Sequence, residues 1–176
     1  MPISETDGPT ENRSITMTRP TLADLPPRPT LAANIELRLM TGLDEAAVWT
    51  AVQQDAEPFM TIGEGLFAHE FGGDPDAISA RCLLAVDTKT GEAVGTSSAW
   101  HGGDPGARGR DWGRIHWVSV RRDYQRKGIA RALVVECLYI MKALGHEKAF
   151  LATSTGRGGA IALYEDLEFV RDTDAL

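Results

Sequence analysis

The sequence predicts an α/β or α+β three-layer sandwich, in which a mixed central sheet carries helices on both faces. Two observations lead to this fold class. Two apolar runs, 81–87 and 93–100, flank a short turn that contains Gly91, which is the pattern of a β-hairpin. From residue 114 onward, strand and helix patterns alternate. Elements in this order pack as layers around one core.

The elements before and after the hairpin follow from local patterns. A strand is expected at 35–40, where the sequence I-E-L-R-L-M alternates. A helix is expected over 41–56, with Thr41 as its N-cap and apolar residues at helical spacing. A shorter helical region is expected within 58–73, ending at a pair of glycines. The glycine-rich, charged stretch 101–113 is expected to form a loop.

The second half is expected to contain a strand, a long helix, a buried strand, another helix and a last strand. Gly145 follows the long apolar run and is expected to end that helix at its C′ position. The expected ranges are 114–120, 129–144, 149–153, 159–167 and 169 onward.

The chain is expected to hold one domain behind a tail. Its 176 residues, 43% of them hydrophobic and 24% charged, suit a single globular core. Residues 1–32 contain six of the nine prolines and few large apolar side chains. Such a segment buries too little surface to offset its ordering entropy. We therefore expect a flexible proline-rich tail at 1–32 and the folded domain at 33–176.

Composition excludes several classes of protein. A net charge of −7 argues against a nucleic-acid binder, because phosphates must be neutralised by basic residues; it suits a cationic substrate. Cys82 and Cys137 lie in apolar runs and indicate buried thiols of a reducing compartment. No signal peptide, membrane span or metal-ligand spacing is visible, so we expect a cytoplasmic protein without a metal or membrane partner. The four scattered histidines are His69, His101, His116 and His146.

The run R-I-H-W-V-S-V-R-R-D-Y-Q-R-K-G-I-A-R-A-L-V-V, residues 114–135, carries most of the chemical information. A strand ends, a basic turn follows, and a helix begins at once, so unpaired backbone N–H groups and the helix dipole meet there. Gly128 and Ala130 leave room for close approach to the backbone. These features indicate an anion site suited to a pyrophosphate. The alternative is an ordinary strand–loop–helix connection with solvated basic side chains.

Two motifs in this half resemble a known family. The run Gln125-x-x-Gly128-x-Ala130 follows an apolar strand, and A-I-A-L-Y-E-D-L-E-F at 160–169 follows after a long helix and a short strand. Together they resemble the signatures of the GCN5-related N-acetyltransferase (GNAT) family. The resemblance implies the acyl-CoA N-acyltransferase fold, acetyl-CoA as cosubstrate, and acetyl transfer to a primary amine of a small molecule or peptide in a ternary complex.

The resemblance also implies which residues bind acetyl-CoA. In the family, the strand before the first motif splays from its neighbour and pairs its backbone with the pantetheine arm, while the following amides hold the pyrophosphate. Arg157 stands where relatives often have an asparagine that contacts the cofactor; it would reach a phosphate or a substrate carboxylate, or be solvated. The expected cofactor-binding residues are Val118, Ser119, Val120, Gln125, Arg126, Lys127, Gly128, Ile129, Ala130, Arg131, Thr153 and Arg157.

Two residues are candidates for proton transfer. Tyr164 matches the tyrosine that protonates the departing thiolate in many relatives; the alternative is a core aromatic with a satisfied hydroxyl. Relatives often use a glutamate on the strand before the first motif, but Arg114 and His116 occupy that region here. The setting I-H-W-V-S-V resembles the serotonin N-acetyltransferase branch, which implies His116 as the base. The alternative is a buried histidine with a structural role.

Two departures from the family pattern concern the end of the chain. Glu168 replaces the usual glycine before Phe169, which puts a backbone conformation with positive φ in doubt. The family sheet ends in a hairpin, yet only one strand fits after the last helix. We therefore expect the final strand to be missing, leaving an exposed edge or one that a second subunit covers in a homodimer.

Other functions stay open at this point. A non-catalytic acyl-CoA-binding module of the same fold fits the missing glutamate, the replaced asparagine and the short sheet. A nucleotide-binding site at the glycine run 156–159 is a weaker alternative, because that run lacks the spacing of a dinucleotide fingerprint and the lysine of a P-loop. The acceptor amine cannot be read from the sequence.

Overall fold

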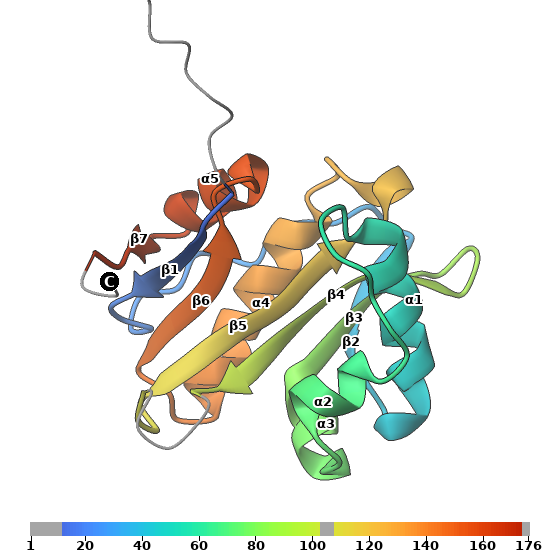
Figure 1. The fold of residues 1–176 in the computed structure, drawn as a ribbon, viewed down its shortest axis with the longest axis horizontal. Coiled ribbons are helices and arrows are strands. Elements are labelled where there is room, and N and C mark those ends of the chain that lie inside the picture. The colour runs from blue at the N-terminus through green and yellow to red at the C-terminus, as the bar shows by residue number, and fades with distance from the viewer. Residues whose placement is uncertain (1–11, 103–107, 174–176) are drawn as a thin grey trace, which may run out of the picture.

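A computed structural model describes residues 12–102 and 108–173, and it shows a mixed seven-stranded sheet between helices (Figure 1). The strand order is β2-β3-β4-β5-β6-β1-β7. Neighbouring strands are antiparallel except β5 and β6, which are parallel. The predicted fold class is confirmed. The strands are β1 Ser14–Arg19, β2 Ile35–Leu39, β3 Cys82–Asp87, β4 Glu92–His101, β5 Trp112–Val120, β6 Lys148–Ser154 and β7 Val170–Arg171.

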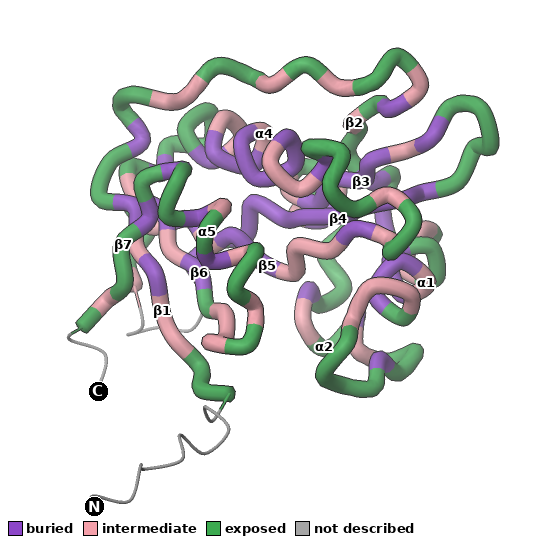
Figure 2. The backbone as a smooth tube through the Cα atoms, turned by 90° about the horizontal axis from the view of Figure 1, so that it is seen from above, coloured by how far each residue is buried: buried purple, intermediate pink, exposed green. Residues whose placement is uncertain are grey.

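Helices cover both faces of the sheet. The helix α4 packs against one face, in the larger of two apolar cores, whereas α1, α2 and α3 enclose a second core on the other face. The central strand β4 is buried from Ala93 to Trp100 because both layers cover it (Figure 2). The helical segments are η1 Leu43–Glu45, α1 Ala46–Ala56, α2 Leu66–Phe71, α3 Pro75–Arg81, η2 Arg122–Tyr124, α4 Ile129–Ala143 and α5 Gly158–Asp166.

The predicted elements of the second half are confirmed to within two residues, whereas the first helical region differs. Thr41 does not cap a helix: its hydroxyl donates to the Asp44 carboxylate, and α1 starts only at Ala46 after a 3-10 turn. Within 58–73 only six residues are helical. The helix α3 was not predicted, although Asp74 caps it by accepting from two backbone N–H groups and a proline opens its first turn.

The predicted tail at 1–32 is wrong for the residues that the structure describes, which begin at residue 12. The segment 14–19 forms β1, which lies between β6 and β7 and pairs with both. Its side chains alternate, and Met17 is fully buried in the larger core. The short alternating pattern S-I-T-M-T-R therefore outweighs the proline-rich composition around it.

The prolines belong to an extended strap, residues 20–34, that crosses the outer side of α4. Leu22 is buried, the Tyr139 hydroxyl donates to the Pro26 carbonyl, and the Arg28 guanidinium pairs with Glu136 while lying over the Tyr139 ring. Proline suits such a segment because it needs no ladder of backbone hydrogen bonds. The strap connects β1 to β2, which lies at the opposite edge of the sheet (Figure 1).

The predicted loss of the final strand needs correction in one respect. Only β7 follows α5, as expected, but the strand that would lie between β6 and β7 is supplied by β1. The edge of β6 is therefore paired within the chain, and the argument for a homodimer at that edge no longer applies.

Glu168 takes up the positive φ expected of a glycine, with φ at +67°. Its carboxylate accepts a hydrogen bond from Arg19 at 2.7 Å. The Arg19 side chain is buried and also donates to the carbonyls of Leu167, Asp24 and Thr21. The substitution is thus accommodated by a buried arginine that joins β1 to the end of α5.

Candidate functional site

The site begins where β5 and β6 separate. The two strands are paired only from Trp112 to Arg114 on β5 and from Lys148 to Phe150 on β6. From Ile115 onward, no strand pairs with the β6-facing edge of β5 in the part of the chain that the structure describes. The predicted splay is therefore present, and it leaves backbone hydrogen-bonding groups of 115–120 facing an open gap.

A β-bulge in β5 places the successive side chains of His116 and Trp117 on the same face of the sheet, the one that α1 and α2 cover. Between the pairs Thr96–Ser119 and Ser98–His116, β5 has one residue more than β4, and Trp117 has a φ of +54°. The buried side chain of Gln53 on α1 stabilises this bulge. Its amide oxygen accepts from the Ser119 hydroxyl at 2.5 Å, and its amide nitrogen donates to the Trp117 carbonyl at 3.4 Å.

A row of free amides lies at the other end of the gap, where η2 leads into α4. In the described residues, the backbone N–H groups of 126–131 have no hydrogen-bond partner, and no side chain caps the helix. Arg126 and Gly128 both have positive φ, at +61° and +79°. Alternating backbone conformations of this kind turn successive N–H groups toward one point, and the helix dipole adds positive potential there.

Glycine is required at 128 for conformation, and the space beside it is empty. A Cβ atom placed on Gly128 would meet nothing within 4 Å. The strain at Arg126, where a left-handed conformation costs on the order of 1–2 kcal/mol, is the kind that persists at ligand sites. The predicted anion site is thus formed by the backbone, with room for a ligand against it.

The free amides border a cavity of about 710 Å³, which we call the long cleft. Ten of the twelve expected cofactor-binding residues line it. They are Val118, Ser119, Val120, Gln125, Arg126, Gly128, Ile129, Ala130, Arg131 and Arg157.

Some expected side-chain roles need correction. Lys127 does not line the long cleft and instead places its ammonium over the Tyr124 ring. The Arg131 guanidinium pairs with Asp166, and the Gln125 side chain donates to the Val120 carbonyl at 3.0 Å. The side chains of Lys127, Arg131 and Gln125 thus contact the turn and α5, whereas Arg126 lines the cleft beside the free amides. Thr153 lies elsewhere, in a second cavity.

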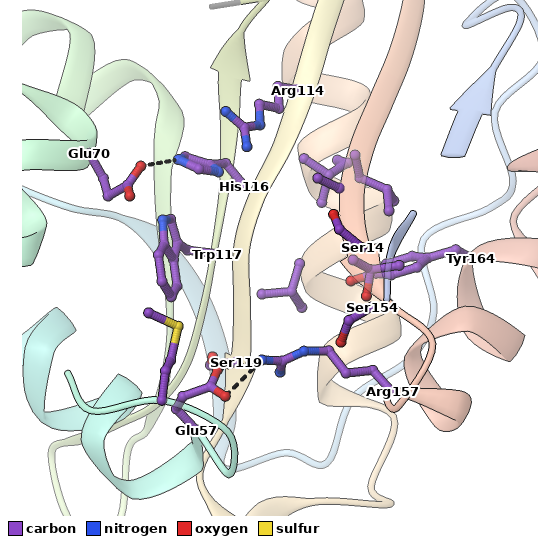
Figure 3. Close-up of a pocket in the computed structure, with 16 residues that line it drawn as sticks. Ser14, Glu57, Glu70, Arg114, His116, Trp117, Ser119, Ser154, Arg157 and Tyr164 are labelled. Carbon is purple, nitrogen blue, oxygen red and sulfur yellow. Dashed lines mark hydrogen bonds and ion pairs between the residues drawn. The ribbon is translucent and has the colours of Figure 1, made fainter. Parts of the chain in front are cut away.

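The second cavity, of about 320 Å³, lies between the separated strands, and we call it the inner pocket (Figure 3). Four residues line both cavities, so the two cavities adjoin each other. The four are Val118, Ser119, Arg157 and Tyr164. Arg114, His116 and Glu70 gather on one side of the inner pocket, and Ser14, Ser154 and Tyr164 lie on the other.

Tyr164 on α5 stands where the two cavities meet. Its ring belongs to the larger core and makes an edge contact with Phe169, with ring centroids 6.0 Å apart. Its hydroxyl has no hydrogen-bond partner among the described residues, so no protein group there satisfies it as the alternative of a core tyrosine would require. Burial raises the pKa of Tyr164 to about 12. The phenol therefore stays protonated at neutral pH and can donate its proton.

His116 on β5 faces Glu70 on α2. The His116 Nε2 lies 3.1 Å from the Glu70 carboxylate, which is drawn as a dashed line in Figure 3. A carboxylate can only accept, so Nε2 carries the hydrogen and Nδ1 keeps its lone pair. Burial, and the nearby Arg114, hold the pKa of His116 below its usual 6.5, although Glu70 opposes this. His116 is therefore neutral, as a proton acceptor must be.

The sequence of the chain matches a known family. The sequence model of the Acetyltransferase (GNAT) family matches residues 46–169, which is most of the chain. The chain belongs to the GNAT acetyltransferase family. The family resemblance of the two sequence motifs is thereby confirmed.

Solved GNAT structures share the fold. The chain is similar to a GCN5-related N-acetyltransferase from Sphaerobacter thermophilus, with 29% identity and a TM-score of 0.66 over 92% of this chain and 48% of that one. It is also similar to the ribosomal-protein-S18-alanine N-acetyltransferase from Escherichia coli, with 21% identity and a TM-score of 0.62 over 79% of each chain. A tandem GNAT protein from the clavulanic acid biosynthesis pathway has 17% identity and a TM-score of 0.64, over 90% of this chain and 50% of that one. The chain thus spans about half the length of the first and third structures. A search of curated proteins finds no match.

Two carboxylates of this GNAT site were not predicted as site residues. Glu70 contacts a histidine 46 positions away, and Glu57 accepts two hydrogen bonds from Arg157, at 2.7 and 2.8 Å, across 100 positions. The Glu57 side chain is only 3% exposed. Arg157 also stacks over Phe59. The Arg157 guanidinium thus connects α5 to the segment after α1. Because Arg157 also lines the long cleft, its contact with a phosphate or a substrate carboxylate stays a prediction.

Within the run 156–159, Gly156 has a structural reason to be a glycine. A Cβ atom on Gly156 would lie 2.8 Å from the Asn12 side-chain oxygen, which accepts from the Gly156 N–H. The N-terminal segment thereby holds the loop that leads into α5, and this loop forms one end of the long cleft.

In the residues that the structure describes, no group of histidines, cysteines and carboxylates is arranged to hold a metal ion. Nor is any helix of that part long and apolar enough to span a bilayer.

Proposed function

We propose that this chain transfers the acetyl group of acetyl-CoA to a primary amine of a small molecule or peptide, by direct attack in a ternary complex. The observation that carries the proposal is that the two cavities adjoin each other at Tyr164. Free amides suited to a pyrophosphate lie at one end, and a neutral histidine and a protonated phenol flank the other.

The chain's own groups fit the cofactor. The amides of 126–131 would bind the pyrophosphate, and the unpaired edge of β5 at 118–120 would pair with the amide groups of the pantetheine arm. The gap between β5 and β6 then directs the thiol end toward Tyr164. When bound, acetyl-CoA supplies an acetyl group activated as a thioester.

The two proton transfers fall on opposite walls of the gap. His116 takes the proton that the amine loses, at Nδ1, while Glu70 accepts from Nε2 and stabilises the resulting imidazolium. As the new C–N bond forms and the C–S bond breaks, Tyr164 donates its hydroxyl proton to the leaving sulfur. No glutamate on β5 is needed, because α2 supplies one to the histidine.

Calorimetry and a thiol-release assay test this function. Coenzyme A and acetyl-CoA should both bind, and acetyl-CoA with a panel of primary amines should release free thiol in an amine-dependent way. Binding without release for every amine would favour the non-catalytic module of the same fold. Absence of heat with both forms of the cofactor would remove the proposal altogether.

A further inference from the structure

One charged side chain of the inner pocket has no partner among the described residues, whereas the others are paired. Glu57 and Arg157 form a bidentate pair, and Glu70 engages His116. Among the described residues that line this pocket, the other arginine, Arg157, is paired. The Arg114 side chain has neither an ion pair nor a hydrogen bond within the described part of the chain. This residue has no role in the proposed acetyl transfer.

Arg114 points to the side of the sheet where the acceptor would bind. Gly113 and Ile115 face α4, since a Cβ on Gly113 would strike Met141 and Ile115 lies in the larger core. Arg114 and His116 therefore project together from the other face (Figure 3). Glu70 acts on Arg114 through space and opposes the lowering of its pKa by burial, but it does not pair with it.

An unpaired guanidinium in this position is costly. The Arg114 side chain is half-buried, and its Nε is buried with no hydrogen-bond partner. The Phe150 ring is its only close aromatic contact among the described residues, 5.9 Å from the guanidinium carbon. Buried polar groups in native proteins almost always have partners, so this exception, which involves a charged side chain that lines a cavity, calls for an explanation.

We infer that the acceptor of this GNAT chain is an amine that also carries a carboxylate, and that Arg114 binds this carboxylate while the amine lies beside His116. The inference rests on the proposed acetyl transfer. A guanidinium presents two parallel N–H groups that match a carboxylate. A monoanion fits better than a phosphate dianion, because Arg157 already pairs with Glu57, which leaves the single charge of Arg114 near the Glu70 carboxylate. Arg114 and His116 are two residues apart on a strand, about 7 Å between Cα atoms, so a few bonds should separate amine and carboxylate.

The test compares amines that differ only in this charge. Glycine, β-alanine, 4-aminobutyrate and 5-aminovalerate are each paired with their primary amide, which keeps the shape and removes the negative charge. Binding to the coenzyme A-loaded protein is measured by calorimetry and ligand-observed NMR, and acetylation is measured by thiol release. In at least one pair the carboxylate should be preferred by about tenfold or more, the effect of one charged hydrogen-bonded pair.

Variants assign the preference to Arg114. Arg114→Gln should bring the ratio between carboxylate and amide close to one, and Arg114→Lys should keep part of it. Lys89→Gln, which removes an equal charge from the exposed hairpin turn, should leave the ratio unchanged. The inference is overturned if the amides bind as well as the carboxylates in every pair, if neither form binds while coenzyme A does, or if Arg114→Gln keeps the preference. Failure of the proposed function is seen separately, as absence of coenzyme A binding.

Discussion

Replacing Tyr164 with phenylalanine removes one oxygen atom from the point where the long cleft and the inner pocket meet. Because the hydroxyl has no partner in the described residues, its loss breaks no internal hydrogen bond. The ring and its contact with Phe169 remain. At neutral pH the variant should therefore be as stable as the wild type within about 1 kcal/mol, whereas turnover should fall by about 100-fold or more, as for the loss of a general acid.

The raised pKa of Tyr164 adds a second, opposite expectation at high pH. A shift from 10.0 to about 12 corresponds to on the order of 2–3 kcal/mol in favour of the protonated folded state. Since the folded pKa lies above the unfolded one, this stability is present below pH 10 and is lost as the pH rises through 12. The variant lacks the titrating group, so it should lose less stability than the wild type between pH 10 and 12.

Urea unfolding at pH 7, 10 and 11.5, together with acetyl-CoA turnover at pH 7 and 9, tests both expectations. Taking the difference in unfolding free energy between variant and wild type at each pH cancels the contributions of the other groups that titrate at high pH. Wild-type turnover should show no alkaline loss from Tyr164 below pH 10. If the variant turns over within about threefold of the wild type, or is destabilised at pH 7 by more than about 2 kcal/mol, Tyr164 is a packing residue and the acid lies elsewhere.

Three further substitutions test the remaining parts of the site and fold. His116→Gln should keep acetyl-CoA affinity but lose turnover. Because the pKa of the wild-type His116 is held below 6.5, wild-type activity should persist below pH 6. A loss of wild-type activity with a midpoint at pH 6.5 in the pH–rate profile would contradict the neutral histidine. Gly128→Ala should cost about 1–2 kcal/mol in urea unfolding and weaken coenzyme A binding in calorimetry. Gly91→Ala, with a similar φ of +75° in the hairpin turn, should show the first effect without the second, and equal affinity in both variants would refute the amide site. Met17→Ala should destabilise the chain by about 2–5 kcal/mol, and a cost near zero would mean that β1 does not belong to the folded domain.

What the sequence predicts correctly is local in the chain. The helix α4 follows from fifteen residues without glycine or proline, and the amide site follows from the strand, turn and glycine that precede it. The carboxylates Glu57 and Glu70 could not be assigned, because their partners lie 100 and 46 positions away and no pattern within one element marks them. The strand β1 had a signal, the alternation around Met17, which the prolines on its C-terminal side masked.

The width of the gap between β5 and β6 is set by segments outside those strands. No backbone ladder joins β5 and β6 beyond Arg114 and Phe150, so each wall needs its own support. Gln53 from α1 stabilises the bulge on the β5 wall. On the other wall, β1 pairs with β6 along its length, and Asn12 holds the loop into α5. The proposed proton acceptor on β5 and the proposed proton donor on α5 therefore depend on different parts of the chain. The N-terminal segment is as much a part of the candidate site as the sequence motif on β5 and α4.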